Sequence, residues 1–380
     1  MTTTEHATHS NEAAPSVLRT EAALWVGLAT TLVLTLFGGA WLDDLSNPLR
    51  FGLLFVWIFG VMLWLSFGVV RHADSLAALL GEPYGTLILT LSVIGIEVIL
   101  ISAVMLTGDK PTLGRDTMFS VVMIVMNGIL GATLLMGGLR HHEQTYNLQG
   151  ANAYLGVILP LSILGLVLPR FTTSAPGGQL STRDSVYLML MSAGLYAVFL
   201  AVQTMRHSRF FVPPPGSAED LVEDEHDLGV VRTAPHHAIF LILTMLPIVL
   251  LSKKLATLVD HGVDVLGAPQ ALGGFFVATL VLAPEALSAA KAALANRLQR
   301  TVNIALGSAL STIGLTIPAV LAVGLLTRET VELGLEPLQI LLLLLTLLVS
   351  IVNFGSGRTN VLHGAVHLIL FFTYVVMLFD

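Results

Sequence analysis

The sequence predicts an all-α polytopic membrane protein with about 11 transmembrane helices, arranged as two inverted five-helix repeats plus an extra N-terminal helix. Of its 380 residues, 54% are hydrophobic and only 11% are charged, and the mean hydropathy is +0.83. Apolar stretches long enough to cross a bilayer core of ~30 Å recur along the chain. One acidic, proline-rich segment interrupts them. This composition excludes a soluble globular domain.

The expected spanning helices are bounded by charged or turn-rich clusters. They cover residues 22–42, 51–70, 83–106, 117–139, 151–168, 185–205, 235–251, 271–290, 301–326, 337–354 and 361–379. The first stretch is expected to remain as a spanning helix, because it is too long for the apolar core of a signal peptide and acidic residues precede it.

The acidic segment divides the chain into two parts of similar make-up. Pro213-Pro214-Pro215-Gly216 opens it, and Glu219, Asp220, Glu223, Asp224, Glu225 and Asp227 follow. It is interpreted either as a cation-sensing cytoplasmic helix or as a solvated linker. We expect an N-terminal tail (1–21), an extra helix (22–42), a first repeat (43–212), the acidic linker (213–234) and a second repeat (235–380). Repeats with an odd number of spans must insert with opposite orientations.

Charge and cysteine content limit the partners. The chain has no cysteine and a formal net charge of -7, so it offers no thiolate site and no basic surface for nucleic acid. The expected partners are the lipid bilayer, inorganic cations and protons. An N-terminus in the cytoplasm would place ten of the eighteen Lys and Arg residues on that side, which favours this orientation. The acidic linker would then also be cytoplasmic.

Two prolines inside apolar stretches each lie beside a glutamate. Glu82 and Pro83 lie between Gly81 and Gly85, and Pro284 precedes Glu285. A carboxylate in a hydrocarbon environment costs at least ~2.5 kcal/mol, so such residues usually face a polar cavity and handle ions or protons. Proline has no backbone N–H, so one carbonyl of the preceding turn lacks its helical donor. We therefore expect Pro83 to kink a long helix that begins near Ser75.

Glu285 has the most apolar surroundings of these acids, because only aliphatic residues and Pro284 flank it. Burial favours its protonated form and a bound cation favours its ionised form, so proton release and cation uptake would be coupled. Glu97 lies fifteen residues after Glu82, or roughly 22 Å along a helix. It is expected to act as a proton-relay or gate residue, or to be a carboxylate that is paired or neutralised.

Each half also carries a stretch of small and polar residues after its acidic motif. In the first half this stretch includes Asn127 and Gly128, and in the second it includes Gly307 and Ser308. The hydroxyls of Ser308, Ser311, Thr312 and Thr316 recur at helical spacings of three and four. They could supply oxygen ligands, or the small residues could serve close helix packing.

Histidines form three pairs, which could bind a transition metal or titrate near neutral pH. Their members are His141 and His142, His236 and His237, and His363 and His367. No third ligand lies nearby in the sequence, which favours interfacial or packed histidines.

Residues 80–93, with Glu97 following, resemble the first signature of the ChaA-type bacterial antiporters of the calcium/cation antiporter superfamily. The resemblance extends through residues 108–117 and 307–318 and covers most of the chain. It implies a secondary transporter without a resident cofactor. Such a protein would export Ca²⁺, and in this branch also Na⁺ or K⁺, in exchange for H⁺ across the bacterial inner membrane.

The resemblance also assigns roles to residues. In calcium/proton exchangers the two motifs read approximately Gly-Asn-Ala-Val-Glu and Gly-Asn-Ala-Ala-Glu, so Glu285 takes the position of the second glutamate. Gly85 aligns with the first glutamate and Glu82 lies one helical turn before it. Val281 and Leu282 replace the usual Gly-Asn pair.

The sequence therefore predicts a cation/proton antiporter and not an enzyme. Glu285 and Glu82 are its expected cation and proton sites and the ligands of any transported metal ion. Asn127, Gly128, Gly307 and Ser308 would line the site, and Gly81, Pro83, Gly85 and Pro284 would shape its backbone. Two alternatives remain at this stage, a passive cation channel and a membrane-embedded metalloenzyme built around His363 and His367.

Overall fold

The computed structural model describes residues 16–81, 84–105, 110–217, 219, 232–265 and 267–379. Before the linker the elements are α1 (Val17–Thr20), α2 (Ala22–Leu36), α3 (Gly38–Leu42), α4 (Pro48–Leu80), α5 (Tyr84–Met105), α6 (Leu113–Met123), η1 (Ile124–Ile129), α7 (Leu130–His141), β1 (Gln144–Thr145), α8 (Leu148–Ser162), η2 (Ile163–Val167), α9 (Leu168–Phe171), α10 (Thr182–Ala201), η3 (Val202–Arg206) and η4 (Ser208–Phe211).

After the linker the described elements are α11 (Ala234–Asp264), α12 (Leu272–Leu294), α13 (Leu298–Ser311), η5 (Thr312–Thr316), α14 (Ile317–Thr327), α15 (Pro337–Asn353), β2 (Arg358–Thr359) and α16 (Val361–Met377). The two short strands pair antiparallel, with Gln144 opposite Thr359.

Seven of the described helices are long and apolar enough to cross a membrane. Four shorter apolar helices accompany them, at Ala22–Leu36, Thr90–Ser102, Pro337–Asn353 and Val361–Met377. Each coincides with a stretch that the sequence predicted to span. The predicted class of polytopic helical protein is confirmed, whereas the count of eleven spans and the repeat boundaries stay predictions.

Helix α4 is longer than the sequence predicted, and its two ends show why. The side chain of Asn47 accepts hydrogen bonds from N–H groups of the first turn, and Pro48 occupies a position where no donor is needed. The helix then continues past Arg71 to Leu80 and ends at Gly81, whose φ of 65° favours glycine. The expected span 51–70 stopped at a charge, but a charged side chain does not end a helix.

The end of α4 also corrects the expected kinked helix. The turns from Ser75 onward belong to α4, and α5 is a separate helix that begins at Tyr84. Helix α11 also continues past the end of its expected span, 235–251. It runs through Lys253 to Asp264.

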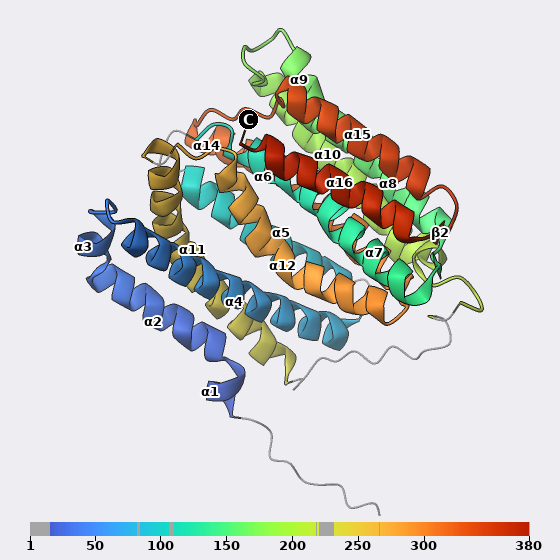
Figure 1. Cartoon of the computed structure of the whole chain (residues 1–380), viewed down its shortest axis with the longest axis horizontal. Coiled ribbons are helices and arrows are strands. Elements are labelled where there is room, and N and C mark those ends of the chain that lie inside the picture. The colour runs from blue at the N-terminus through green and yellow to red at the C-terminus, as the bar shows by residue number, and fades with distance from the viewer. Residues whose placement is uncertain are drawn as a thin grey trace, which may run out of the picture.

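The helices form two groups with two glutamate-bearing helices between them (Figure 1). Helices α2, α4 and α11 pack against one another, while α6 to α10 and α13 to α16 form the larger group. Helices α5 and α12 each contact both groups. Helix α12 contributes Leu282 to the larger hydrophobic cluster and Val281 to the smaller one. Consecutive residues on a helix point about 100° apart, so α12 joins the two cores.

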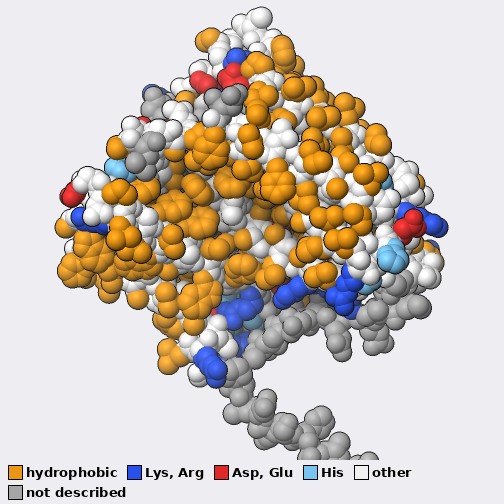
Figure 2. Space-filling model, viewed as in Figure 1, with side chains coloured by type: hydrophobic (Ala, Val, Ile, Leu, Met, Phe, Trp, Pro, Cys, Tyr) orange, Lys and Arg blue, Asp and Glu red, His pale blue; other side chains and the backbone are white. Residues whose placement is uncertain are grey.

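Apolar side chains cover much of the outer surface (Figure 2). Leu53, Val56, Leu326 and Val352 are all more than half exposed. Lys and Arg side chains gather mainly along one edge of the view, away from the apolar area. This distribution is that of a surface in contact with lipid, with basic residues at its border.

Glycines bring α7 and α16 into close contact. A Cβ atom added at Gly131 would lie 2.9 Å from the backbone nitrogen of Leu368. One added at Gly364 would meet the backbone nitrogen of Leu135 and lie 2.8 Å from the carbonyl oxygen of Gly131. The two backbones therefore touch, and only glycine fits at the crossing.

We expect Gly364→Ala to lower the stability of the folded protein by about 1–3 kcal/mol, because an added methyl group must push two backbones apart. Thermal unfolding in detergent would show this as a lower Tm. Gly156→Ala is the matched control, because a Cβ added there meets nothing within 4 Å. Equal Tm values for the two variants would contradict the close crossing.

Candidate functional site

Glu97 lies in the middle of α5 and is fully buried, with 0% of its surface exposed. Its Oε2 accepts a hydrogen bond of 2.9 Å from the hydroxyl of Thr312, which is the first residue of η5. Its Oε1 is buried and has no hydrogen-bond partner in the described part of the chain. One oxygen of this carboxylate is therefore held in place and the other is available to a ligand.

Glu285 lies in α12, directly after Pro284. The hydroxyl of Ser308, on α13, and the carboxylates of Glu97 and Asp74 act on its side chain electrostatically. The Oε2 of Glu285 is buried and also lacks a partner among the described residues. The structure thus brings Glu97, Glu285 and Ser308 into one site.

Two π-helical segments support this site. Segment η1 begins at Ile124 and η5 begins at Thr312, in each case 27 residues after the glutamate of its own half. Helix α5 packs on η5, and α12 packs on η1. Each glutamate helix thus contacts the π-helical segment of the other half. A π-helical turn disrupts the regular ladder of backbone hydrogen bonds and often occurs at functional sites.

Glu97 and Glu285 thus precede their π-helical segments by the same number of residues. The sequence alone instead favours a pairing of the two motifs through Pro83 and Pro284. Glu82 and Pro83 lie outside the described residues, so the expected role of Glu82 stays a prediction.

Asn127 lies in η1 and is fully buried. Its side-chain nitrogen donates to the hydroxyl of Thr346 at 2.8 Å, and its side-chain oxygen lies 3.1 Å from Nδ1 of His367. The carboxamide therefore faces α15 and α16 in this structure.

The glycines predicted to line the site pack against aromatic rings. A Cβ atom at Gly128 would lie 3.1 Å from the ring of Phe371, and one at Gly307 would lie 3.6 Å from the hydroxyl of Tyr154. Gly128 therefore makes room for the ring on α16, whereas a methyl group at Gly307 would meet only ordinary van der Waals contact.

The glycines and prolines predicted to shape the backbone of the two motifs lie at different positions in their helices. Gly81 ends α4, and Gly85 lies in the first turn of α5. Pro284 lies inside α12, so the carbonyl oxygen of Leu280 receives no N–H from it.

The sequence offers Thr312 as a possible oxygen ligand but does not reveal its partner. Glu97 lies 215 positions away, and helical spacing does not show such a pairing. Asp74 is not assigned to the site from sequence. Asp74 lies in the last turns of α4, beyond the end of the expected span. Had the expected span extended to Leu80, as α4 does, it would have included Asp74 and marked this acid as a candidate site residue.

The histidine pairs lie apart from one another along the fold. Among the residues that the structure describes, no group of three or more His, Cys, Asp or Glu side chains is arranged to hold a metal ion. His141 bonds to the carbonyl oxygen of Leu294, and His367 is buried beside Asn127.

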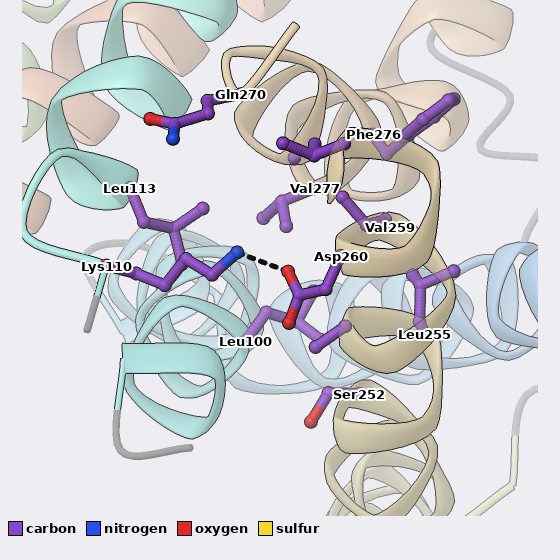
Figure 3. A pocket seen from close by; sticks show the side chains of 13 residues that line it. Leu100, Lys110, Leu113, Ser252, Leu255, Val259, Asp260, Gln270, Phe276 and Val277 are labelled. Carbon is purple, nitrogen blue, oxygen red and sulfur yellow. Dashed lines mark hydrogen bonds and ion pairs between the residues drawn. The ribbon is translucent and has the colours of Figure 1, made fainter. Parts of the chain in front are cut away.

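A hollow lies between α5, α11 and the start of α12 (Figure 3). Lys110 and Asp260 point toward one another across it and form an ion pair. Most of its other lining side chains are apolar, and Leu100 among them lies three residues after Glu97. The hollow therefore reaches within about one helical turn of the carboxylate along α5.

Buried, partly unpartnered carboxylates in a helical membrane protein define the class of secondary ion transporters. Residues 51–205 and 236–379 match the family model described as sodium/calcium exchanger protein. The chain belongs to this family.

Curated relatives cover most of the chain. It is 42% identical over 315 residues to the sodium-potassium/proton antiporter ChaA of Escherichia coli (strain K12), a match that covers 83% of this chain and 85% of that protein. It is 22% identical over 311 residues to the Ca²⁺/H⁺ antiporter ChaA of Bacillus subtilis (strain 168), covering 81% and 85%.

Solved structures share the fold. Native YfkE aligns with a TM-score of 0.71 at 18% identity, covering 94% of this chain and 99% of that chain. The H⁺/Ca²⁺ exchanger CAX aligns with a TM-score of 0.64 at 13% identity, covering 94% and 88%. The structural matches confirm the predicted fold class. The family model and the curated relatives confirm the predicted family of cation antiporters. They do not support a channel or an enzyme.

We expect Thr312→Val to lower the apparent cation affinity about tenfold, because a hydrogen bond to a charged group contributes about 1.5–3 kcal/mol. Valine keeps the shape of threonine and removes only the donor to Glu97. The measurement is the cation concentration that gives half-maximal transport in proteoliposomes. Thr373→Val is the control, because the Thr373 hydroxyl bonds to its own helix on the exposed surface. Equal affinities would rule out this role of Thr312.

Proposed function

We propose that the protein is a secondary active antiporter that exports Ca²⁺, with Na⁺ and K⁺ as further substrates, in exchange for H⁺. One observation carries the proposal: two buried carboxylates, Glu97 and Glu285, act on one another, and each has one oxygen without a hydrogen-bond partner among the described residues. The proposal replaces Glu82 with Glu97 as the partner of Glu285.

The charge on this pair links the two substrates. Two adjacent ionised carboxylates in a low-dielectric interior repel each other, so protons or cations must offset their charge. Two protons and one Ca²⁺ each neutralise the pair, and one Na⁺ or K⁺ can replace one proton. Binding of one substrate therefore requires release of the other, which is the condition for antiport.

The surrounding groups suit a partly dehydrated cation. Thr312 and Ser308 each place a hydroxyl beside one of the two carboxylates. Hard cations prefer such oxygen ligands. The positions of Val281 and Leu282 supply no side-chain amide, so the site offers fewer oxygens than a Gly-Asn motif would.

The names of the relatives support the choice of ions. The relative from Escherichia coli is named for sodium, potassium and protons, and the one from Bacillus subtilis is named for Ca²⁺ and protons. We propose that this chain shares both substrate groups and acts in the bacterial inner membrane.

The crossed packing of α5 on η5 and α12 on η1 supports two inverted halves, 43–212 and 235–380. Segments that are related in this way form a site where the halves meet. We place the N-terminus and the acidic linker in the cytoplasm, in line with the distribution of Lys and Arg.

Glu285→Gln and Glu97→Gln should each abolish cation-driven proton movement, because a neutral amide cannot exchange a proton. Fluorescence-monitored proton flux in proteoliposomes measures this after addition of Ca²⁺, Na⁺ or K⁺. Glu143→Gln should transport normally, because Glu143 is exposed and pairs only loosely with Arg358, at 3.7 Å.

Glu82→Gln in the same assay separates the two assignments of the first glutamate. Full exchange in Glu82→Gln together with loss in Glu97→Gln supports the site described above. The opposite result would return the role to Glu82, and full exchange in Glu285→Gln would refute the whole proposal.

An imposed pH gradient should drive Ca²⁺ accumulation in vesicles against the Ca²⁺ gradient, and Na⁺ or K⁺ should compete with it. Competition is expected because all three ions need the same two carboxylates. Isotope uptake with and without competing ions measures it. Cation movement that only follows its own gradient would indicate a channel.

A further inference from the structure

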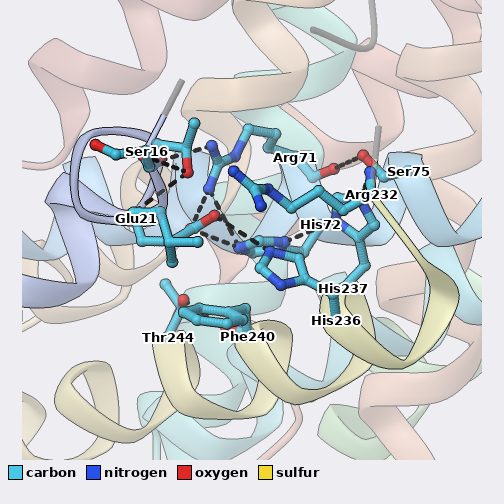
Figure 4. A network of polar contacts seen from close by, with 12 residues as sticks. Ser16, Glu21, Arg71, His72, Ser75, Arg232, His236, His237, Phe240 and Thr244 are labelled. Atoms are coloured by element: carbon cyan, nitrogen blue, oxygen red, sulfur yellow. Dashed lines mark hydrogen bonds and ion pairs between the residues drawn. The ribbon is translucent and has the colours of Figure 1, made fainter. Parts of the chain in front are cut away.

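A chain of buried polar side chains joins the N-terminal segment, α4 and the start of α11 (Figure 4). Glu21 lies between α1 and α2, His72 lies in α4, and His237 lies in the first turn of α11. They are 3%, 0% and 3% exposed. The exchange mechanism proposed above uses none of them.

The contacts form a continuous series. Nε2 of His72 lies 3.0 Å from Oε2 of Glu21, and Nδ1 of His72 lies 3.0 Å from Nδ1 of His237. The backbone N–H of Arg232 donates to Nε2 of His237 at 3.0 Å.

The backbone N–H of Arg232, at one end of the series, determines which ring nitrogens of His237 and His72 carry a proton. The Arg232 amide can only donate, so Nε2 of His237 must accept and its proton must lie on Nδ1. That N–H donates to Nδ1 of His72, whose own proton therefore lies on Nε2 and points to Glu21. In the observed geometry both imidazoles are neutral, and only one pair of tautomers satisfies all three contacts.

Other charged groups face the series from each packed element. Arg71 donates to the carbonyl oxygen of Thr20 and to the carboxylate of Glu21, and its Nη2 lies 3.2 Å from Nε2 of His72. His236 Nε2 lies 3.7 Å from Oε1 of Glu21. Arg71 and Arg232 thus bring positive charge near the imidazoles, while Glu21 supplies the negative charge.

A further proton must break the series. A second proton on His237 would bind Nε2, which would then face the N–H of Arg232 as a second donor. A second proton on His72 would bind Nδ1, which would then face the Nδ1–H of His237. If His237 changed tautomer to accept that proton's hydrogen bond, its Nε2–H would again face the N–H of Arg232. Proton uptake by either ring therefore opens a contact at 3.0 Å that cannot hold two donors.

We propose that His72 and His237 form a proton-binding site, separate from the transport carboxylates, at which a further proton opens either the contact between the two rings or the contact of His237 with the Arg232 amide. While the series is intact, it joins the N-terminal segment, α4 and the start of α11. Transport requires helices to move relative to each other, so opening of the series removes a restraint and exchange becomes faster.

Hydrogen–deuterium exchange of the full-length protein in lipid nanodiscs tests the opening of the series, with rates corrected for the intrinsic effect of pH. We expect protection of the Arg232 amide at pD 8 and at least a tenfold loss of protection at pD 5.5, across the range in which histidine titrates.

Matched variants distinguish titration from structure. His237→Gln keeps an acceptor near the position of Nε2 but cannot be protonated, so its protection should not change with pD. His237→Ala should be unprotected at both values, and His207→Gln should behave like wild type. An unchanged wild-type protection, or the same loss in His237→Gln, would overturn the proposal.

Transport assays test the consequence, and this part alone rests on the proposed function. We expect the ratio of the wild-type rate to the His237→Gln rate to rise at least twofold when the pH on the linker side falls from 8 to 6. His72→Asn, which keeps an acceptor for His237, should match His237→Gln. A constant or falling ratio would overturn the effect on exchange. Loss of all transport in wild type would instead count against the antiport assignment.

Discussion

The burial of two carboxylates in an apolar helical interior is the constraint on which the rest of the structure depends. An ionised carboxylate in such surroundings is costly unless a proton, a cation or hydrogen-bond donors offset its charge. The fold places the hydroxyls of Thr312 and Thr316 against Glu97 and that of Ser308 against Glu285. Among the residues that the structure describes, one oxygen of each carboxylate is buried without a hydrogen-bond partner. This partial satisfaction leaves room for a transported ion, which complete pairing would exclude.

The packing of the helices follows from the need to hold these acids without filling the site. Helices α5 and α12 lie between the two groups of helices, where both hydrophobic clusters can support α12. The π-helical segments interrupt the regular backbone pattern where each half meets the glutamate helix of the other. Close glycine contacts, as between α7 and α16, keep the surrounding body compact.

The two proposals place proton binding at two sites with different physical properties. In the proposed function the carboxylates at the ion site exchange a proton for a cation, so their protonation belongs to the transport cycle. The imidazoles of His72 and His237 lie in a hydrogen-bonded series whose donors are already all assigned. A proton there changes which contacts can exist.

The sequence by itself determined the class of fold, because long apolar stretches in a lipid environment must become helices that satisfy their own backbone. It also identified Glu285, whose apolar neighbours are visible in the chain, and the family resemblance. Helix ends were harder to predict from the sequence, because α4 and α11 continue past charged residues that a hydropathy pattern treats as boundaries. Only the tertiary structure decided that Thr312 meets Glu97 and that His72 meets His237. These contacts join residues far apart in sequence, and such pairings depend on how helices pack, which local periodicity does not encode.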